Sequence, residues 1–307
     1  MVKPDMTIEL GPLRLKNPIL TASGTFGYGL EFLPYFDLSR LGGLCTKGLS
    51  PRPRLGNPPA RIVETPSGML NTIGLQNIGV DTFLSDRLPK LREYDLEIIA
   101  NVFGETEAEY IEVCRKLSKA EGVAAIELNV SCPNVEEGGM IFGNDPAALQ
   151  QVTRACREAC DLPLIVKLSP NVTDIRVTAE AAVAGGADIL SLINTYVGMA
   201  IDIERRKPVL TKISGGLSGP AIRPLAVWLT WQVAQTVDVP IIGMGGITDE
   251  RDAMEFFLAG ASAVQVGTSN FVHPDAAVRV VDGLERFLAD RNIPSVQSIV
   301  GRLEVPR

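Results

Sequence analysis

The chain has one histidine and no excess of basic charge, and each shortage excludes a class of function. A single histidine, His273, cannot build a histidine-rich metal site and argues against Ser-His-Asp catalysis. There are 29 Lys and Arg against 36 Asp and Glu, giving a formal net charge of −7. Proteins that bind nucleic-acid phosphates need a basic face, so we expect no nucleic-acid partner. If the chain is an enzyme, a group other than histidine should move its protons.

The cysteine content is also low, and it argues against disulfides. The cysteines are odd in number, and no C-x-x-C occurs among Cys45, Cys114, Cys132, Cys156 and Cys160. This usage fits a reducing compartment. No uncharged apolar stretch reaches the roughly 18 residues of a membrane helix, and the first residues carry no apolar signal core. We therefore expect a cytoplasmic protein that does not enter a membrane.

What the chain does contain is a recurring unit, in which a short apolar run is followed by an amphipathic helical stretch. Eight such runs occur, at Pro18–Ala22, Gly43–Thr46, Leu96–Val102, Val123–Val130, Leu164–Leu168, Asp188–Ile193, Val239–Gly243 and Ala263–Val266. Near-continuous apolar strands are typical of a parallel sheet buried on both faces. Eight units in one undivided chain predict an α/β fold, a (β/α)₈ TIM barrel forming a single domain over residues 1–307. A doubly wound sheet is the alternative, but Ser23–Gly29 matches its G-x-G-x-x-G poorly.

Barrel enzymes place their active sites at the carboxyl ends of the strands. The residues that follow the eight runs are polar and rich in amides, with no facing carboxylate pair of the kind that glycosidases need. Glycines follow the last two runs, at Gly245, Gly246 and Gly267, and Thr268 comes next. Such glycines let backbone N–H groups approach an anion, so we expect a phosphate there, with the loop 214–220 adding donors. The alternative is that they only form tight turns.

Two lysines, Lys47 and Lys167, follow buried strands, where a solvated lysine is not expected. An inward cation can hold an anionic substrate or an electron-rich cofactor edge, or it can form a Schiff base. Snorkelling at the barrel rim is the alternative.

The fourth run delivers Asn129 and then leads into Ser131-Cys132-Pro133-Asn134. The stretch to Asn144 is long and contains glycine, so we predict a mobile active-site loop, ended by a helix that starts at Asp145-Pro146. A thiol on such a loop can act as a base when its surroundings tune it. The other four cysteines are interpreted as packing residues, with Cys45 in a strand and the rest in helices.

An insert after the second run carries Asn71-Thr-Ile-Gly-Leu-Gln-Asn77, and Asn194-Thr195 follow the sixth run. Their amides suit a small polar ring, although turn formation explains each equally well. His273, before Pro274, is interpreted as structural.

The motifs as a set resemble the class 1 dihydroorotate dehydrogenases. The resemblance runs from Leu15 to Asp290 and rests on Thr21-Ala-Ser-Gly-Thr-Phe-Gly, Thr46-Lys-Gly, Asn71–Asn77, Asn129-Val-Ser-Cys-Pro-Asn, Val166-Lys-Leu-Ser-Pro-Asn, Ile193-Asn-Thr, Ser214-Gly-Gly-Leu-Ser-Gly-Pro, Gly243-Met-Gly-Gly-Ile and Val266-Gly-Thr. Val135-Glu-Glu-Gly-Gly-Met-Ile-Phe-Gly and Gly198-Met-Ala-Ile-Asp are similar to the catalytic subunit of the B type. Tyr196 departs from the family, in which a smaller aliphatic residue is expected.

The resemblance implies an FMN enzyme of pyrimidine synthesis that oxidises dihydroorotate to orotate. It makes Cys132 the base at C5, with hydride passing from C6 to the flavin. It assigns the substrate to Lys47, Asn71, Thr72, Ile73, Gly74, Leu75, Asn129, Asn134, Asn194 and Thr195. It assigns FMN to Ser23, Lys47, Gly48, Asn101, Asn129, Lys167, Ile193, Gly219, Gly245, Gly246, Gly267 and Thr268. No metal site is expected.

The B-type resemblance further implies electron transfer to NAD⁺ through a partner subunit that carries FAD and a 2Fe–2S cluster. The chain itself has no cysteine spacing suited to a cluster. A homodimeric core within a heterotetramer is the expected assembly. The alternatives are a fumarate-linked A-type enzyme, a dihydropyrimidine dehydrogenase, a flavin-free lyase or isomerase with a Schiff base on Lys167, and a non-catalytic scaffold.

Overall fold

The computed structural model describes residues 3–130 and 142–306, and eight of their strands close into a parallel barrel. In chain order the strands are β3 (Ile19–Thr21), β4 (Gly43–Cys45), β7 (Glu97–Val102), β8 (Ala125–Asn129), β9 (Leu164–Lys167), β10 (Ile189–Leu192), β15 (Ile241–Met244) and β16 (Ala263–Val266). Each pairs with the next along the chain, and β16 pairs with β3. The eight apolar runs are these strands in the same order, so the predicted (β/α)₈ barrel is confirmed.

An N-terminal hairpin closes one end of the barrel. It consists of β1 (Ile8–Leu10) and β2 (Leu13–Leu15), which pair antiparallel. Its leucines and isoleucine pack in one cluster with inward side chains of the strands, among them Leu20 and Ile99. Gly11, at its turn, sits against the residues where β10 and β15 begin. Among residues 3–130 and 142–306, the hairpin thus covers the amino ends of the strands, whereas their carboxyl ends border a cavity.

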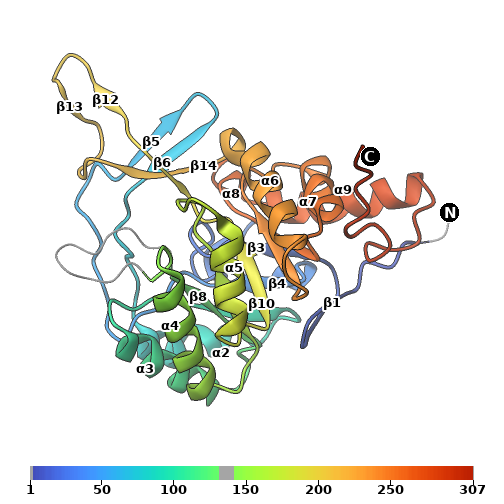
Figure 1. Ribbon diagram of the computed structural model, residues 1–307, viewed down its shortest axis with the longest axis horizontal. Coiled ribbons are helices and arrows are strands. Elements are labelled where there is room, and N and C mark those ends of the chain that lie inside the picture. The colour runs from blue at the N-terminus through green and yellow to red at the C-terminus, as the bar shows by residue number, and fades with distance from the viewer. Residues whose placement is uncertain (1–2, 131–141, 307) are drawn as a thin grey trace.

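Helices cover the outside of the barrel (Figure 1). The longer ones are α3 (Glu107–Ser118), α4 (Pro146–Ala159), α5 (Ile175–Ala184), α6 (Arg223–Ala234), α7 (Glu250–Ala259) and α9 (Ala276–Asp290). The predicted helix start is confirmed, since the Asp145 side chain accepts hydrogen bonds from the N–H groups of Ala147 and Ala148, and Pro146 begins α4. Cys160 was predicted to be helical, which is wrong by one residue, because α4 ends at Ala159.

The shorter helices lie in the connections. They are α1 (Val80–Thr82), the π-helix η3 (Phe83–Arg87), α2 (Leu88–Leu91), α8 (Ser269–Val272) and the 3₁₀ turns η1 (Leu30–Phe32), η2 (Leu38–Arg40) and η4 (Pro220–Ile222). His273 caps the C-terminal end of α8. Within the described ranges, no helix combines the length and the hydropathy needed to cross a bilayer.

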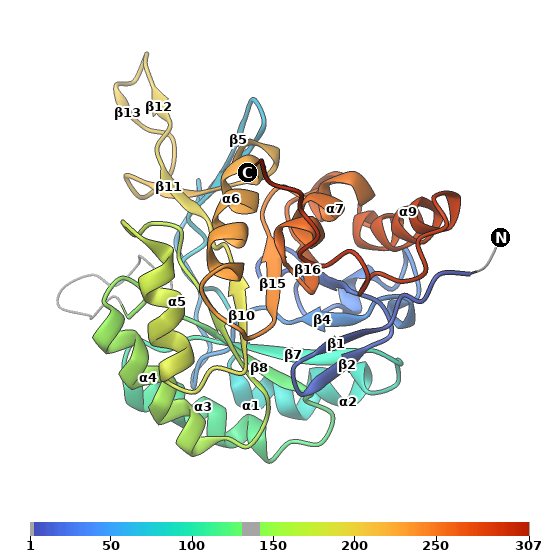
Figure 2. The ribbon, with the colours of Figure 1, turned by 45° about the vertical axis from the view of Figure 1, so that its right-hand side comes forward.

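A second, four-stranded sheet lies outside the barrel. Its strands are β5 (Ile62–Thr65), β6 (Gly68–Asn71), β11 (Tyr196–Gly198) and β14 (Gly215–Ser218), in the antiparallel order β11-β14-β6-β5. The hairpin of β12 (Ile201–Asp202) and β13 (Lys207–Pro208) extends beyond it and stands away from the barrel in both views (Figures 1 and 2). The prediction that 214–220 is a loop is wrong for Gly215–Ser218.

Candidate active site

A cavity of about 430 Å³ opens between the carboxyl ends of the barrel strands and the four-stranded sheet. This volume is within the range of small-molecule sites. Most residues predicted for the site line it, namely Ser23, Lys47, Asn71, Thr72, Ile73, Gly74, Leu75, Asn129, Lys167, Ile193, Asn194, Thr195, Gly219, Gly245, Gly246, Gly267 and Thr268. They come from strands on both sides of the barrel and from β6, so the fold brings distant segments together.

Two predicted residues lie outside the cavity lining, and two others are not described by the structure. Gly48 and Asn101 do not line the cavity, and a Cβ on Gly48 would lie 2.9 Å from Oδ1 of Asn101, which is fully buried. Cys132 and Asn134 lie outside the described residues, as does the loop predicted around them.

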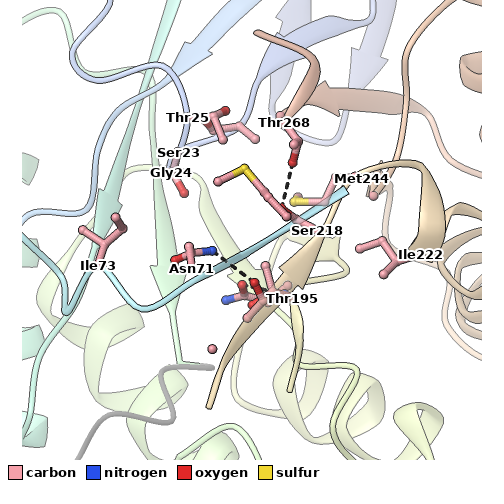
Figure 3. A pocket seen from close by; sticks show the side chains of 18 of the residues that line it. Ser23, Gly24, Thr25, Asn71, Ile73, Thr195, Ser218, Ile222, Met244 and Thr268 are labelled. Carbon is pink, nitrogen blue, oxygen red and sulfur yellow. Dashed lines mark hydrogen bonds between the residues drawn. The ribbon is translucent and has the colours of Figure 1, made fainter. Parts of the chain in front are cut away.

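Glycine-rich turns form one wall of the cavity. Gly245 and Gly246 follow β15 with φ of 130° and 77°, values that favour glycine. Gly267 and Thr268 follow β16, and the Thr268 hydroxyl donates a hydrogen bond of 2.9 Å to the Ser218 hydroxyl of β14 (Figure 3). This contact ties the outer sheet to the barrel next to the glycines. The wall therefore combines backbone N–H groups and hydroxyls, the donor set that suits a phosphate.

Amide side chains form a second group around the cavity. Asn194 Nδ2 donates to Asn129 Oδ1 at 3.2 Å, and the Thr195 N–H donates to Asn194 Oδ1 at 2.8 Å. Asn71 Nδ2 donates to the Gly216 carbonyl at 3.3 Å, so it lies on the face made by β6 and β14, beside Thr195 (Figure 3). Amides gathered at one cavity present both donors and acceptors, as recognition of a planar polar ring requires.

The turn after β6 has an unusual backbone. Gly74 has φ of 74°, and a Cβ there would lie 2.7 Å from the Asn57 backbone nitrogen. Leu75 follows with φ of 58°, a left-handed conformation that leucine rarely adopts. Asn57 Nδ2 donates to the Thr72 carbonyl at 2.8 Å and holds the turn. Such conformations persist where the surroundings impose them and gather at ligand sites.

Beneath the cavity lies a carboxylate inside β8 that was not among the predicted site residues. Glu127 is fully buried, and its Oε1 accepts hydrogen bonds from Asn101 Nδ2 (2.7 Å) and the Cys45 thiol (3.2 Å). Its Oε2 accepts from Ser191 Oγ (2.9 Å) and Gln265 Nε2 (2.8 Å).

The ammonium of Lys167 lies 3.8 Å from Oε1 of this carboxylate. Burial raises the pKa of Glu127, but the Lys167 charge and the hydrogen bonds outweigh it, so the pKa is below its ordinary value. Burial and the neighbouring carboxylate raise the pKa of the Cys45 thiol well above its ordinary value. Cys45 is therefore a protonated hydrogen-bond donor, and its interpretation as a packing residue was incomplete.

Other cavity residues were expected only as parts of wider motifs, namely Gly24, Gln76, Ser214, Gly215, Gly216 and Ser218. Those that were not predicted are Ala22, Thr25, Ile62, Met69, Val197, Ile222, Met244, Gln265 and Phe271. The sequence does contain a signal for Glu127, Ser191 and Gln265. Each is a polar residue within a mainly apolar run, which indicates a polar partner inside the barrel. Over the described ranges, no group of three or more metal-ligating side chains is present.

Comparisons with known proteins cover nearly the whole chain. The family model described as "Dihydroorotate dehydrogenase" matches residues 6–288. A Geobacter (strain M21) protein named "Dihydroorotate dehydrogenase B (NAD(+)), catalytic subunit" is 54% identical over 99% of this chain and 100% of its own. A protein of the same name from Trichlorobacter lovleyi is 56% identical with the same coverages.

A solved structure shows the same fold. It is a crystal structure of DHODH in complex with ferulenol from Eimeria tenella, which superposes with a TM-score of 0.82 at 24% identity. The match covers 97% of this chain and 88% of the other.

Proposed function

Because the chain belongs to the dihydroorotate dehydrogenase family, we propose that it oxidises dihydroorotate to orotate in pyrimidine synthesis, as the catalytic subunit of an NAD⁺-linked enzyme. The observation that carries the proposal is the cavity itself, which joins a glycine wall, a group of amides and two lysines at the carboxyl end of the barrel. The barrel and its inserts use most of the chain, which supports one catalytic domain over 1–307.

The residues present fit FMN, the flavin of this family. The glycine wall at Gly245, Gly246 and Gly267, with Thr268, suits the phosphate. Lys47 and Lys167 supply positive charge to the same cavity, as an electron-rich ring requires. Among the described side chains, the buried Oε1 of Gln265, a residue that lines the cavity, has no hydrogen-bond partner. An acceptor left in this way is explained when a bound ring supplies the donor.

The chain's own groups bind and orient the substrate. Lys47 lines the cavity and can pair with the carboxylate of dihydroorotate, while Asn71, Asn129 and Asn194 can bond the polar edges of its ring. Ser23, Ile193 and Gly219 are proposed to line the flavin, and Thr72 to Leu75 the substrate. Gly48 and Asn101 lie behind this wall, where they can shape it.

One proton transfer is assigned to the chain. We keep Cys132 as the proposed base that takes the proton from C5, with Asn134 beside the substrate. When bound, FMN supplies the two-electron acceptor for the hydride that leaves C6. Loss of one proton and one hydride balances the oxidation to orotate.

A Schiff-base reaction on Lys167 is disfavoured by the same geometry. A lysine nucleophile has to be a neutral amine. Neutralising Lys167 would leave Glu127, which is fully buried, without its counter-charge at 3.8 Å. Such an unpaired buried charge costs several kcal/mol, roughly 3–5.

The electron acceptor implies a second subunit. The relatives are named as catalytic subunits, which is the basis for proposing a partner. We propose that the partner carries FAD and a 2Fe–2S cluster, that a homodimer of this chain forms the core of a heterotetramer, and that the assembly is cytoplasmic. The four described cysteines are all buried, so they are not accessible as ligands for an iron–sulfur cluster.

The test is an acceptor assay on purified protein. The proposal expects a yellow protein with one FMN per chain that is reduced by dihydroorotate. NAD⁺ should be reduced only when an iron–sulfur flavoprotein subunit is present. Turnover with fumarate would support the A type, and a colourless protein that takes up no FMN would refute the flavin assignment.

A further inference from the structure

Glu127 does not line the cavity, yet two of its partners do. Lys167 and Gln265 both line it, and both contact the buried carboxylate from their strands, β9 and β16. The carboxylate therefore lies one layer below the groups that a ligand meets. It can act on a ligand only through them or through its charge.

An ionised carboxylate only accepts hydrogen bonds, and it offers about four lone-pair sites. Asn101, Cys45, Ser191 and Gln265 occupy all four at distances of 2.7–3.2 Å. The Gln265 amide must therefore turn its NH₂ group toward Glu127. Its oxygen then faces away, and this Oε1 is buried without a partner among the described residues. The hydrogen bond to the carboxylate thus fixes the orientation of the Gln265 amide, so that a ligand meets its oxygen rather than its NH₂ group.

Lys167 is held in a different way. At 3.8 Å its ammonium is beyond hydrogen-bond distance from Oε1, so the interaction is a charge pair rather than a direct bond. Both groups are almost completely buried, at 5% exposure for Lys167 and 0% for Glu127. Screening by water is weak there, so each charge depends strongly on the other. The positive charge that reaches the cavity is the lysine charge reduced by the carboxylate beneath it.

We propose that Glu127 is a positioning residue, which moderates the charge of Lys167 and orients the amide of Gln265 beneath the flavin ring. The ring then meets one cationic donor and one acceptor in fixed places. The pyrimidine edge of a flavin alternates carbonyl and N–H groups, so it matches such a pair. This inference rests on the proposed FMN function, and it adds that the reduction potential of the flavin is set partly from inside the barrel.

The test is a double-mutant cycle on the FMN-loaded protein with the variants E127Q, K167M and E127Q/K167M. The readout is the midpoint potential of the bound flavin. In E127Q the lysine charge is no longer moderated, so the potential should become more positive. We expect the ratio of reduced to oxidised flavin at a fixed potential to rise on the order of tenfold. In the K167M background the lysine charge no longer offsets burial, so the pKa of Glu127 rises and less of its charge remains, and E127Q should change that ratio by less than about twofold.

Ser191→Ala is the matched control, because it removes one hydrogen bond from Oε2 and leaves every charge in place. It should lower thermal stability without moving the potential. An equal shift from E127Q in both backgrounds, or no shift in either, would overturn the proposal.

If E127Q does not take up FMN, the same cycle is measured by thermal unfolding of the flavin-free proteins. The proposal then expects E127Q alone to lower the unfolding temperature and E127Q in K167M to leave it unchanged or raise it. Equal losses in both backgrounds would overturn the pairing. Wild-type protein that binds no FMN would refute the proposed function instead, and the unfolding cycle would still decide whether the two charges act together.

Discussion

Adding one methyl group at Gly24 is expected to weaken FMN binding without weakening the fold. Gly24 follows β3 and lines the cavity (Figure 3). A Cβ built on it meets no atom within 4 Å, and its φ is not one that favours glycine. Alanine there should therefore cause no clash within the protein. Alanine also allows the unfolded chain fewer conformations than glycine does. This restriction should raise the free energy of unfolding by about 0.4–1 kcal/mol.

Because Gly24 lines the cavity, a ligand that fills the cavity should meet the same methyl group. Forcing an extra methyl into a filled site costs about 1–3 kcal/mol. This cost corresponds to roughly 5- to 150-fold weaker FMN binding, since about 1.4 kcal/mol is a factor of ten. Titration of flavin-free protein by quenching of FMN fluorescence measures the affinity, and thermal unfolding of the same protein measures the stability.

Gly68→Ala is the matched control at the outer sheet. Its Cβ would lie 2.1 Å from the Ser218 carbonyl oxygen, so β6 and β14 would have to separate. We expect a loss of about 1–3 kcal/mol in the flavin-free protein together with weaker FMN binding. The reasoning is refuted if Gly24→Ala binds FMN within about twofold of wild type, or if it unfolds as easily as Gly68→Ala.

Three further predictions concern charge and proton transfer. Cys132→Ala should lower dihydroorotate oxidation by about 10²-fold or more while FMN stays bound; loss of FMN together with activity would count against the proposed base. Lys47→Ala should raise KM and slow flavin reduction, because it removes a cavity cation; unchanged steady-state kinetics would contradict this role. Glu127 has a lowered folded pKa, so its stabilising contribution is present above its ordinary value of 4.5 and is lost as pH falls through the folded pKa. The stability gap between wild type and E127Q should therefore shrink as pH falls from 6 toward 3 in urea unfolding series, whereas a constant gap would show that its ionisation is not linked to folding.

The barrel was predictable because its signal is local. A strand buried on both faces needs a continuous apolar run, and each of the eight runs is short and bounded by turn residues. The site followed from the barrel, since all strands end at one mouth. Many predicted site residues end a barrel strand or follow its end closely, as Asn129, Lys167 and Gly245 do, so their positions needed only the strand ends.

The outer sheet could not be predicted in the same way. Its strands come from two segments that are far apart in the sequence. The glycine-rich sequence of β14 also lacks the alternation of apolar and polar residues that indicates a strand. These glycines are explained only by contacts in the folded chain. A Cβ on Gly215 would lie 2.7 Å from the Asn71 carbonyl oxygen, so the close approach of β14 to β6 excludes larger residues.

The Glu127 network was missed for a related reason. Its hydrogen-bond partners lie 26, 64, 82 and 138 residues away in the sequence. A polar residue in an apolar strand indicates that something inside the barrel must pair with it. It does not indicate which inward side chain does so, because that depends on the register of neighbouring strands.

The central claim is that this cavity holds a flavin that dihydroorotate reduces, and an anaerobic titration tests it most directly. Purified protein is loaded with FMN and titrated with dihydroorotate while the flavin absorbance is followed. We expect complete bleaching at one equivalent of dihydroorotate per bound flavin, with orotate as the product. A protein that binds no FMN, or a bound flavin whose spectrum dihydroorotate does not change, would contradict it.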